Sequence, residues 1–168
     1  MNMMLETTAP VAKPEVVKPA KPRILLVDDD PAIRQILLHL LTEEGYLVLT
    51  AAHGAEALAL IQATKFDLVL LDLNMPVKGG WETFEQLTAK NPLLPIILIT
   101  ARPNQLFPAL ASGVGALLEK PLDFVKLFDS IRTLLEETPE ARLARMAGHS
   151  SSFRYIPPIP GATKGQNK

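Results

Sequence analysis

The chain contains no cysteine among its 168 residues. This absence excludes disulfide bonds, thiolate-bound metals and thiol catalysis, and it suits the reducing cytoplasm. The charges nearly cancel, with 17 basic and 18 acidic side chains and a net charge of −1, so we expect neither a nucleic acid nor a membrane surface as a partner. No apolar run approaches the roughly 18–20 residues that a membrane-spanning helix needs. With no signal-peptide pattern at the N-terminus, a cytoplasmic protein is expected.

Hydrophobic residues make up 48% of the chain, enough for one domain with a sizeable core. We place this domain at residues 23–137. Residues 1–22 are rich in proline, lysine and alanine and predict a flexible tail. Residues 138–168 predict a short helix over 140–147, followed by a flexible tail that contains several prolines. The basic residues Arg142, Arg145 and Arg154 are expected only to solvate this tail.

Short apolar runs and segments of helical spacing alternate within the domain. Near-continuous apolar runs suit parallel strands that are buried on both faces. They occupy residues 24–27, 47–49, 68–71, 96–99 and 116–118. Four of the intervening helices have a clear apolar face, whereas Pro103 and Pro108 limit the fourth to one or two turns over residues 107–111. The alternation predicts an open α/β sheet with helices on both faces.

Polar side chains stand where these apolar runs end. Asp28 and Asp29 follow the first run, Asp72 the third and Thr100 the fourth, and Lys120 lies just beyond the fifth. Ligands of an open parallel sheet bind outside the carboxyl ends of its strands. The five side chains are therefore expected to converge on one site. Asp30 is excluded from this set, because Pro31 after it marks Asp30 as the cap of a helix.

Three carboxylates in one site need a cation. Two unit charges about 4 Å apart interact by roughly 4 kcal/mol at an effective dielectric constant of about 20. Oxygen ligands without cysteine or histidine favour Mg²⁺. A carboxylate nucleophile, a metal and a lysine together suit phosphoryl transfer to aspartate. A hydrolase that works through an aspartyl-phosphate fits the same residues.

At these positions the sequence resembles the receiver domains of two-component response regulators. The resemblance covers roughly residues 23–137 and rests on four motifs in order: ILLVDDDP at 24–31, LLDLNMP at 70–76, ILITA at 97–101 and EKP at 119–121. It implies a flavodoxin-like (βα)5 fold, in which a doubly wound sheet of five parallel strands has the order 2-1-3-4-5. It also implies a phosphorelay protein that is not an enzyme beyond its own phosphorylation and dephosphorylation.

The resemblance assigns a role to each site residue. Asp72 would accept the phosphoryl group, with a histidine kinase or a phosphotransfer protein as the donor. Mg²⁺ would be bound directly by Asp29 and Asp72 and by the backbone carbonyl of Asn74, and largely through water by Asp28. Thr100 and Lys120 would contact the phosphoryl group. The peptide bond between Lys120 and Pro121 would be cis.

The sequence departs from the family pattern in three ways. Leu117 stands where an aromatic residue is usual, the interval between Thr100 and Lys120 is short, and Gly79 replaces an acidic residue. These departures leave open a second interpretation, a receiver-like interaction module that does not use phosphate. The hydrolase interpretation would need a catalytic acid two residues after Asp72, but that position is Asn74.

Overall fold

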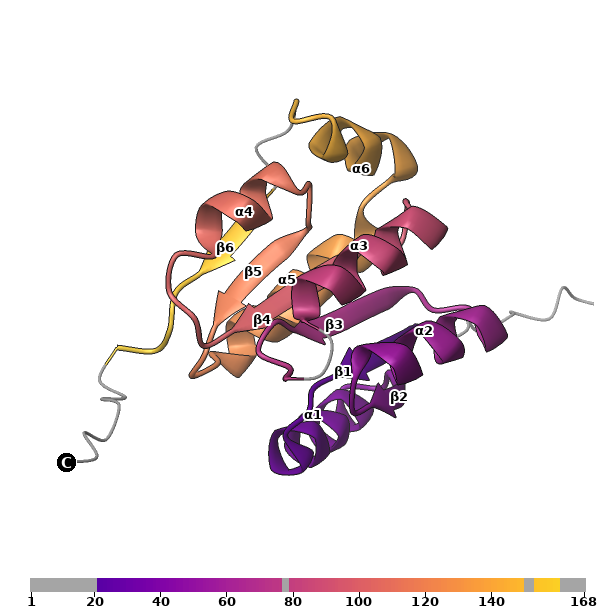
Figure 1. The fold of residues 1–168 in the computed structure, drawn as a ribbon, viewed down its shortest axis with the longest axis vertical. Helices are drawn as coiled ribbons and strands as arrows, with labels where there is room; N and C mark the ends of the chain where they lie inside the picture. The colour runs from indigo at the N-terminus through magenta and orange to yellow at the C-terminus, as the bar shows by residue number, and fades with distance from the viewer. Residues whose placement is uncertain (1–20, 77–78, 150–152, 161–168) are drawn as a thin grey trace, which may run out of the picture.

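The computed structural model describes residues 21–76, 79–149 and 153–160, so almost all of the predicted tail at 1–22 lies outside the described residues. Strands and helices alternate along the domain (Figure 1). The elements are β1 (Arg23–Val27), α1 (Pro31–Glu43), β2 (Leu47–Ala51), α2 (Gly54–Ala63), β3 (Leu68–Asp72), α3 (Gly80–Lys90), β4 (Ile96–Thr100), α4 (Leu106–Ala111), β5 (Ala116–Glu119), α5 (Phe124–Glu136), α6 (Pro139–Met146) and β6 (Arg154–Ile156). Within the described ranges, no helix has the length and apolar character to span a membrane.

The strands form one parallel sheet in the order β2-β1-β3-β4-β5-β6. The predicted order 2-1-3-4-5 is confirmed, and β6 extends it by one strand. The order changes direction at β1, which lies between β2 and β3. The carboxyl ends of β1 and β3 are therefore adjacent, and Asp28 and Asp29 come to lie beside Asp72.

Helices cover both faces of the sheet, as the apolar runs predicted. One core cluster joins strand residues to α2, α3 and α4, and it includes Leu58, Phe84 and Ala109. The other cluster joins the opposite face to α1 and α5, and it includes Leu37 and Ile131. The two layers bury β3 and β4 on both sides, which explains their continuous apolar sequences.

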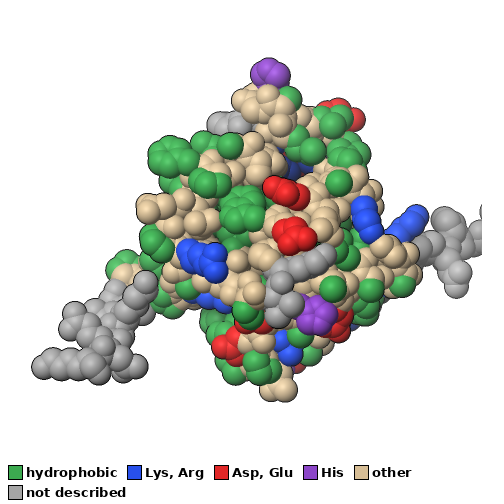
Figure 2. Space-filling model, in the orientation of Figure 1, with side chains coloured by type: hydrophobic (Ala, Val, Ile, Leu, Met, Phe, Trp, Pro, Cys, Tyr) green, Lys and Arg blue, Asp and Glu red, His purple; other side chains and the backbone are tan. Residues whose placement is uncertain are grey.

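The helix caps agree with the sequence signals. The Asp30 side chain accepts hydrogen bonds from the backbone N–H groups of Ala32 and Ile33 at 2.8 and 3.2 Å, and Pro31 occupies the first turn of α1. The short α4 is six residues long, as its prolines predicted. It buries Ala109 and leaves Phe107 and Leu110 on the surface, where Figure 2 shows apolar side chains gathered over this corner.

The C-terminal region corrects two expectations. A helix was predicted over residues 140–147 and is observed as α6, but Arg154–Ile156 form strand β6 instead of a flexible tail. The three arginines that were expected only to solvate the tail make structural contacts instead, and that of Arg154 is with Asp129 and Thr133 on α5. Arg145 is 5% exposed and pairs with Glu137, which also accepts a hydrogen bond from Arg142. These contacts attach α6 to the end of α5, and the chain then returns along the edge of β5.

Candidate functional site

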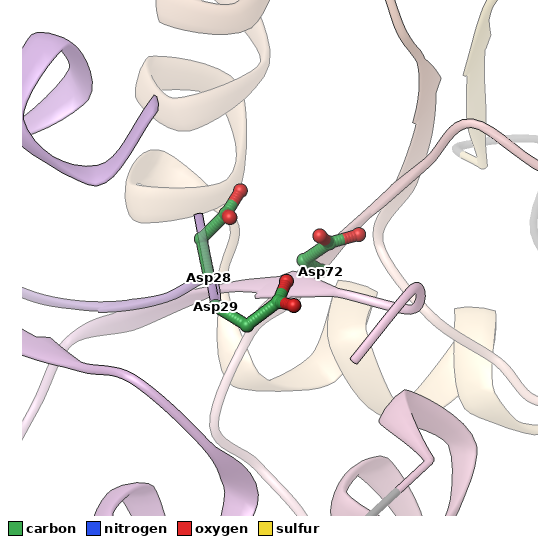
Figure 3. Close-up of side chains that lie close together, drawn as sticks. All are labelled: Asp28, Asp29 and Asp72. Carbon is green, nitrogen blue, oxygen red and sulfur yellow. The ribbon is translucent and has the colours of Figure 1, made fainter. Parts of the chain in front are cut away.

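Three carboxylates meet at the carboxyl ends of β1 and β3. Asp28 and Asp72 are buried, with 1% and 2% of their surface exposed, whereas Asp29 is exposed. One oxygen from each of the three lies within 4.8 Å of the others. Figure 3 shows the side chains converging from the loop after β1 and from the end of β3. This arrangement follows from the pairing of β1 with β3.

Lys120 provides a cation for the two buried carboxylates. Its Nζ atom lies 3.1 Å from Oδ2 of Asp28 and 3.0 Å from Oδ2 of Asp72. Burial alone would lower the pKa of Lys120, but the charges and hydrogen bonds of Asp72 and Asp28 outweigh it and raise the pKa above its usual value. The Lys120 backbone N–H donates to the carbonyl of Thr100 at 2.7 Å, and the peptide bond to Pro121 is cis as expected.

Burial dominates the electrostatics of Asp28. It raises the pKa of this carboxyl above the usual value, although Lys120 and the backbone N–H of Asp30 act in the opposite direction. The backbone around Asp28 is also fixed, because its carbonyl accepts a hydrogen bond from the Arg34 guanidinium at 2.6 Å. Arg34 was missed in the sequence. Its only signal there is its position in the first turn of α1, close to the loop that it contacts.

The loop after β3 links the acidic cluster to β4 through Asn74. The Asn74 backbone N–H donates to Oδ1 of Asp72 at 3.0 Å, and the Asn74 side-chain oxygen accepts from the Thr100 hydroxyl and the Ala101 N–H, both at 3.1 Å. Thr100 is fully buried, and its hydroxyl also accepts from the N–H of Arg102 at 2.9 Å. Asn74 therefore ties two strand ends together, a role that the sequence did not reveal.

Trp81, His53 and Leu117 have structural roles. Trp81 packs against the core with an edge-on contact to Phe84, and its Nε1 donates to Gln105 at 2.9 Å. His53 caps α2 by accepting from the N–H of Glu56 at 3.2 Å. Leu117, where the family pattern has an aromatic residue, is completely buried in β5.

The donor set of the acidic cluster fits a hard divalent cation. It consists of carboxylate oxygens from Asp28, Asp29 and Asp72, and backbone carbonyls lie on the same loops. Mg²⁺ prefers such ligands and retains water in its remaining positions, for which the exposed side chain of Asp29 leaves access.

Comparison with known proteins agrees with this geometry. The family model of the response regulator receiver domain matches residues 24–132. The transcriptional regulatory protein GlrR of Escherichia coli is 39% identical over 126 residues, which cover 74% of this chain and 28% of GlrR. The chain therefore spans only about a quarter of that relative.

Two solved structures of the same fold are also similar. The Thermotoga maritima response regulator TrrA in complex with Mg²⁺-BeF has a TM-score of 0.63 and 35% identity, covering 67% of this chain and 98% of TrrA. The complex of the histidine kinase ThkA with TrrA gives a TM-score of 0.62 and 36% identity, covering 68% of this chain and 99% of the matched one. The open parallel sheet and the acidic cluster at its switch point agree with a receiver domain. The chain belongs to the response regulator receiver domain family, which functions in two-component phosphorelays.

Proposed function

We propose that Asp72 is the phosphoacceptor of this domain and that its phosphorylation requires Mg²⁺. The observation that supports this most strongly is the pair of buried carboxylates, Asp28 and Asp72, held by the single ammonium of Lys120. Such a pair is unfavourable in the absence of cations, and the same charges favour binding of a metal and of a phosphoryl group beside it.

The transfer forms one bond and breaks one. A carboxylate oxygen of Asp72 attacks phosphorus, the bond from phosphorus to the donor breaks with its electron pair leaving on the donor atom, and an acyl phosphate forms on Asp72. With a phosphohistidine donor the broken bond is P–N, and the imidazole nitrogen takes up the electron pair. Hydrolysis later returns the carboxylate and inorganic phosphate. The domain is thus altered by its own reaction and does not turn over an external substrate.

Each neighbouring residue has a distinct part in this reaction. Asp28, Asp29 and Asp72, with the backbone carbonyl of Asn74, would hold Mg²⁺, which neutralises charge on the phosphoryl oxygens. Lys120 orients the Asp72 carboxylate before the reaction and can follow the charge to a phosphoryl oxygen afterwards, since its Nζ lies 3.0 Å from Oδ2 of Asp72. Thr100 is linked to Asp72 through Asn74, and its hydroxyl would donate to a second phosphoryl oxygen.

A histidine kinase or a phosphotransfer protein is the proposed donor. The complex of ThkA with TrrA supports a kinase partner, because that regulator has the same fold as this chain. The expected absence of a nucleic-acid partner and the cytoplasmic location both stay predictions.

Intact-mass spectrometry after incubation with acetyl phosphate tests the proposal. The parent should gain one phosphoryl group with Mg²⁺ and none with a chelator. Asp72→Asn should gain none while keeping its far-ultraviolet circular dichroism. Asp67→Asn is a matched control, because Asp67 precedes the opposite end of β3, where it accepts the N–H of Arg23. It should label like the parent. Equal labelling of Asp72→Asn would disprove the assignment, and an unlabelled parent that still binds Mg²⁺ would favour the interaction module that does not use phosphate.

A further inference from the structure

Strand β6 and the residues just after it contact the chain on both sides of Lys120. Burial and the neighbouring Glu119 carboxylate raise the pKa of the Tyr155 phenol above its usual value, and Tyr155 pairs with Leu117, two positions before Glu119. Four residues after Tyr155, the backbone N–H of Ile159 donates to the carbonyl of Pro121 at 3.3 Å. Glu119 and Pro121 are the immediate neighbours of Lys120. The C-terminal segment therefore fixes the chain just before and just after the lysine.

The strand is attached to β5 along one edge and to the α1 and α5 layer through one face. It pairs in parallel with β5, with Tyr155 opposite Leu117 and Ile156 opposite Leu118. Ile156 is 6% exposed and enters the core cluster of α1 and α5. On the same side, the Arg154 guanidinium pairs with Asp129 and donates to the Thr133 hydroxyl, both on α5. Figure 1 shows β6 along the free edge of β5.

Lys120 thus lies between two strands that both restrain its backbone. From β4, the carbonyl of Thr100 accepts its N–H. On the other side, β6 pairs with β5 up to Leu118, and Ile159, three residues beyond β6, donates to Pro121. The strand itself is only three residues long and lies at the edge of the sheet, so it belongs to the parts of a fold that open locally at low free energy.

We propose that β6 is a positioning element of the phosphoacceptor site, and that phosphorylation of Asp72 loosens its attachment to β5. This inference rests on the proposed function. With β6 in place, Lys120 is held where it pairs with Asp28 and Asp72. A phosphoryl group on Asp72 requires Nζ to move to a phosphoryl oxygen, and the pairing of β6 with β5 and the bond at Pro121 resist that movement. The coupling is reciprocal. If phosphorylation weakens the attachment of β6, then a substitution that weakens this attachment should favour the phosphorylated state.

Hydrogen exchange with mass spectrometry on the full chain tests the first half. The probe is Mg²⁺ with beryllofluoride, the combination present in the TrrA structure. We expect slower exchange in peptides that cover residues 70–76 and at least about threefold faster exchange in peptides that cover 153–160. Protection at 70–76 with unchanged or slower exchange at 153–160 overturns the inference and leaves the proposed function intact.

The reciprocal test uses the two tyrosines of the chain. Tyr155→Phe removes only the hydroxyl beside Glu119, and we expect it to tighten the binding of beryllofluoride at saturating Mg²⁺ about two- to fivefold. The affinity for Mg²⁺ alone should not change, because no proposed metal ligand is altered. Tyr46→Phe, just before β2 at the far edge of the sheet, is the matched control and should bind beryllofluoride like the parent. Beryllofluoride binding by Tyr155→Phe that is equal to or weaker than the parent's also overturns the inference. A parent that takes up no phosphoryl group instead refutes the proposed function.

Discussion

Lys120 and Asp72 are 48 positions apart in sequence, yet Nζ of the lysine lies 3.0 Å from Oδ2 of the aspartate. The same ammonium lies 3.1 Å from Oδ2 of Asp28. One cation therefore serves two buried carboxylates whose oxygens also belong to the candidate Mg²⁺ site. Lysine and metal share these two carboxylates and repel each other as like charges, and this competition makes the site testable with simple substitutions.

Replacement of Lys120 should strengthen Mg²⁺ binding while slowing phosphorylation. Lys120→Met keeps the length of the side chain but removes the ammonium that competes for Asp28 and Asp72. We expect Mg²⁺ affinity to rise by roughly tenfold, equivalent to about 1.4 kcal/mol. The phosphorylation rate should fall, because a cation near the developing phosphoryl charge is lost. Isothermal titration calorimetry measures the first effect and intact-mass kinetics the second.

Lys126→Met is the control for this experiment. Lys126 pairs with Asp123 at 3.5 Å on the surface of the same region, so its loss removes one positive charge without altering the acidic cluster. Its Mg²⁺ affinity should stay close to that of the parent. Weaker Mg²⁺ binding by Lys120→Met than by this control would contradict the competition.

Asp28→Asn should stabilise the metal-free domain. Burial raises the pKa of Asp28, so its ionised form destabilises the fold at pH values above that pKa, and the penalty is relieved as the pH falls through it. The amide removes this penalty and can still accept the N–H of Asp30. In chelator at pH 7 we expect a higher thermal midpoint, by a few degrees or roughly 1 kcal/mol. Saturating Mg²⁺ should then stabilise the variant less than the parent, because a proposed ligand is missing. A lower midpoint in chelator would show that the pairing with Lys120 outweighs burial.

The sequence predicted the parts of the site that follow from sheet topology. Asp28, Asp72 and Lys120 each stand at or just after the end of an apolar run, and parallel strands bring such ends to one edge. Pro103 and Pro108 likewise predicted that α4 would be short. These features depend on local signals and on the general order of strands.

The missed features depend on contacts between distant segments. The strand Arg154–Ile156 is too short for a periodic pattern and is followed by proline, so its pairing with β5 has no local signal. In the sequence, Arg145 has the pattern of a solvated residue. In the folded chain, α6 places its guanidinium against Glu137 and the carbonyl of Gly113. The side-chain bonds of Asn74 also arise only once β3 and β4 are neighbours.

The attachment of α6 should make stability sensitive to acid through Glu137. Burial would raise the pKa of Glu137, but its bonds to Arg145 and Arg142 outweigh burial and lower the pKa below the usual 4.5. A lowered folded-state pKa contributes stability that is complete above the unfolded value and is lost as the pH falls through the folded one. Glu137→Gln should cost about 3 kcal/mol at pH 7, since it leaves the buried Arg145 without its counter-charge.

Urea unfolding at several pH values between 3 and 7 measures this effect. The difference in unfolding free energy between parent and Glu137→Gln should shrink as the pH falls below about 4.5. Glu140→Gln, on the exposed side of α6, provides the control, with a small and nearly constant difference. A parent-to-Glu137→Gln difference that stays constant down to pH 3 would contradict the role of the ion pair.

Gly54 and Thr83 set how closely α2 and α3 approach each other. A Cβ atom on Gly54 would lie 2.0 Å from the Thr83 hydroxyl oxygen, which is buried and has no hydrogen-bond partner among the described residues. Gly54→Ala should therefore destabilise the domain by about 1–3 kcal/mol. Thr83→Ala should be nearly neutral or stabilising, since it removes an unsatisfied polar group. Combining the two should recover much of the loss, because the closest clash is with the hydroxyl that Thr83→Ala deletes. Urea unfolding of all four proteins measures this coupling, and purely additive effects would show that the hydroxyl does not limit the helix packing.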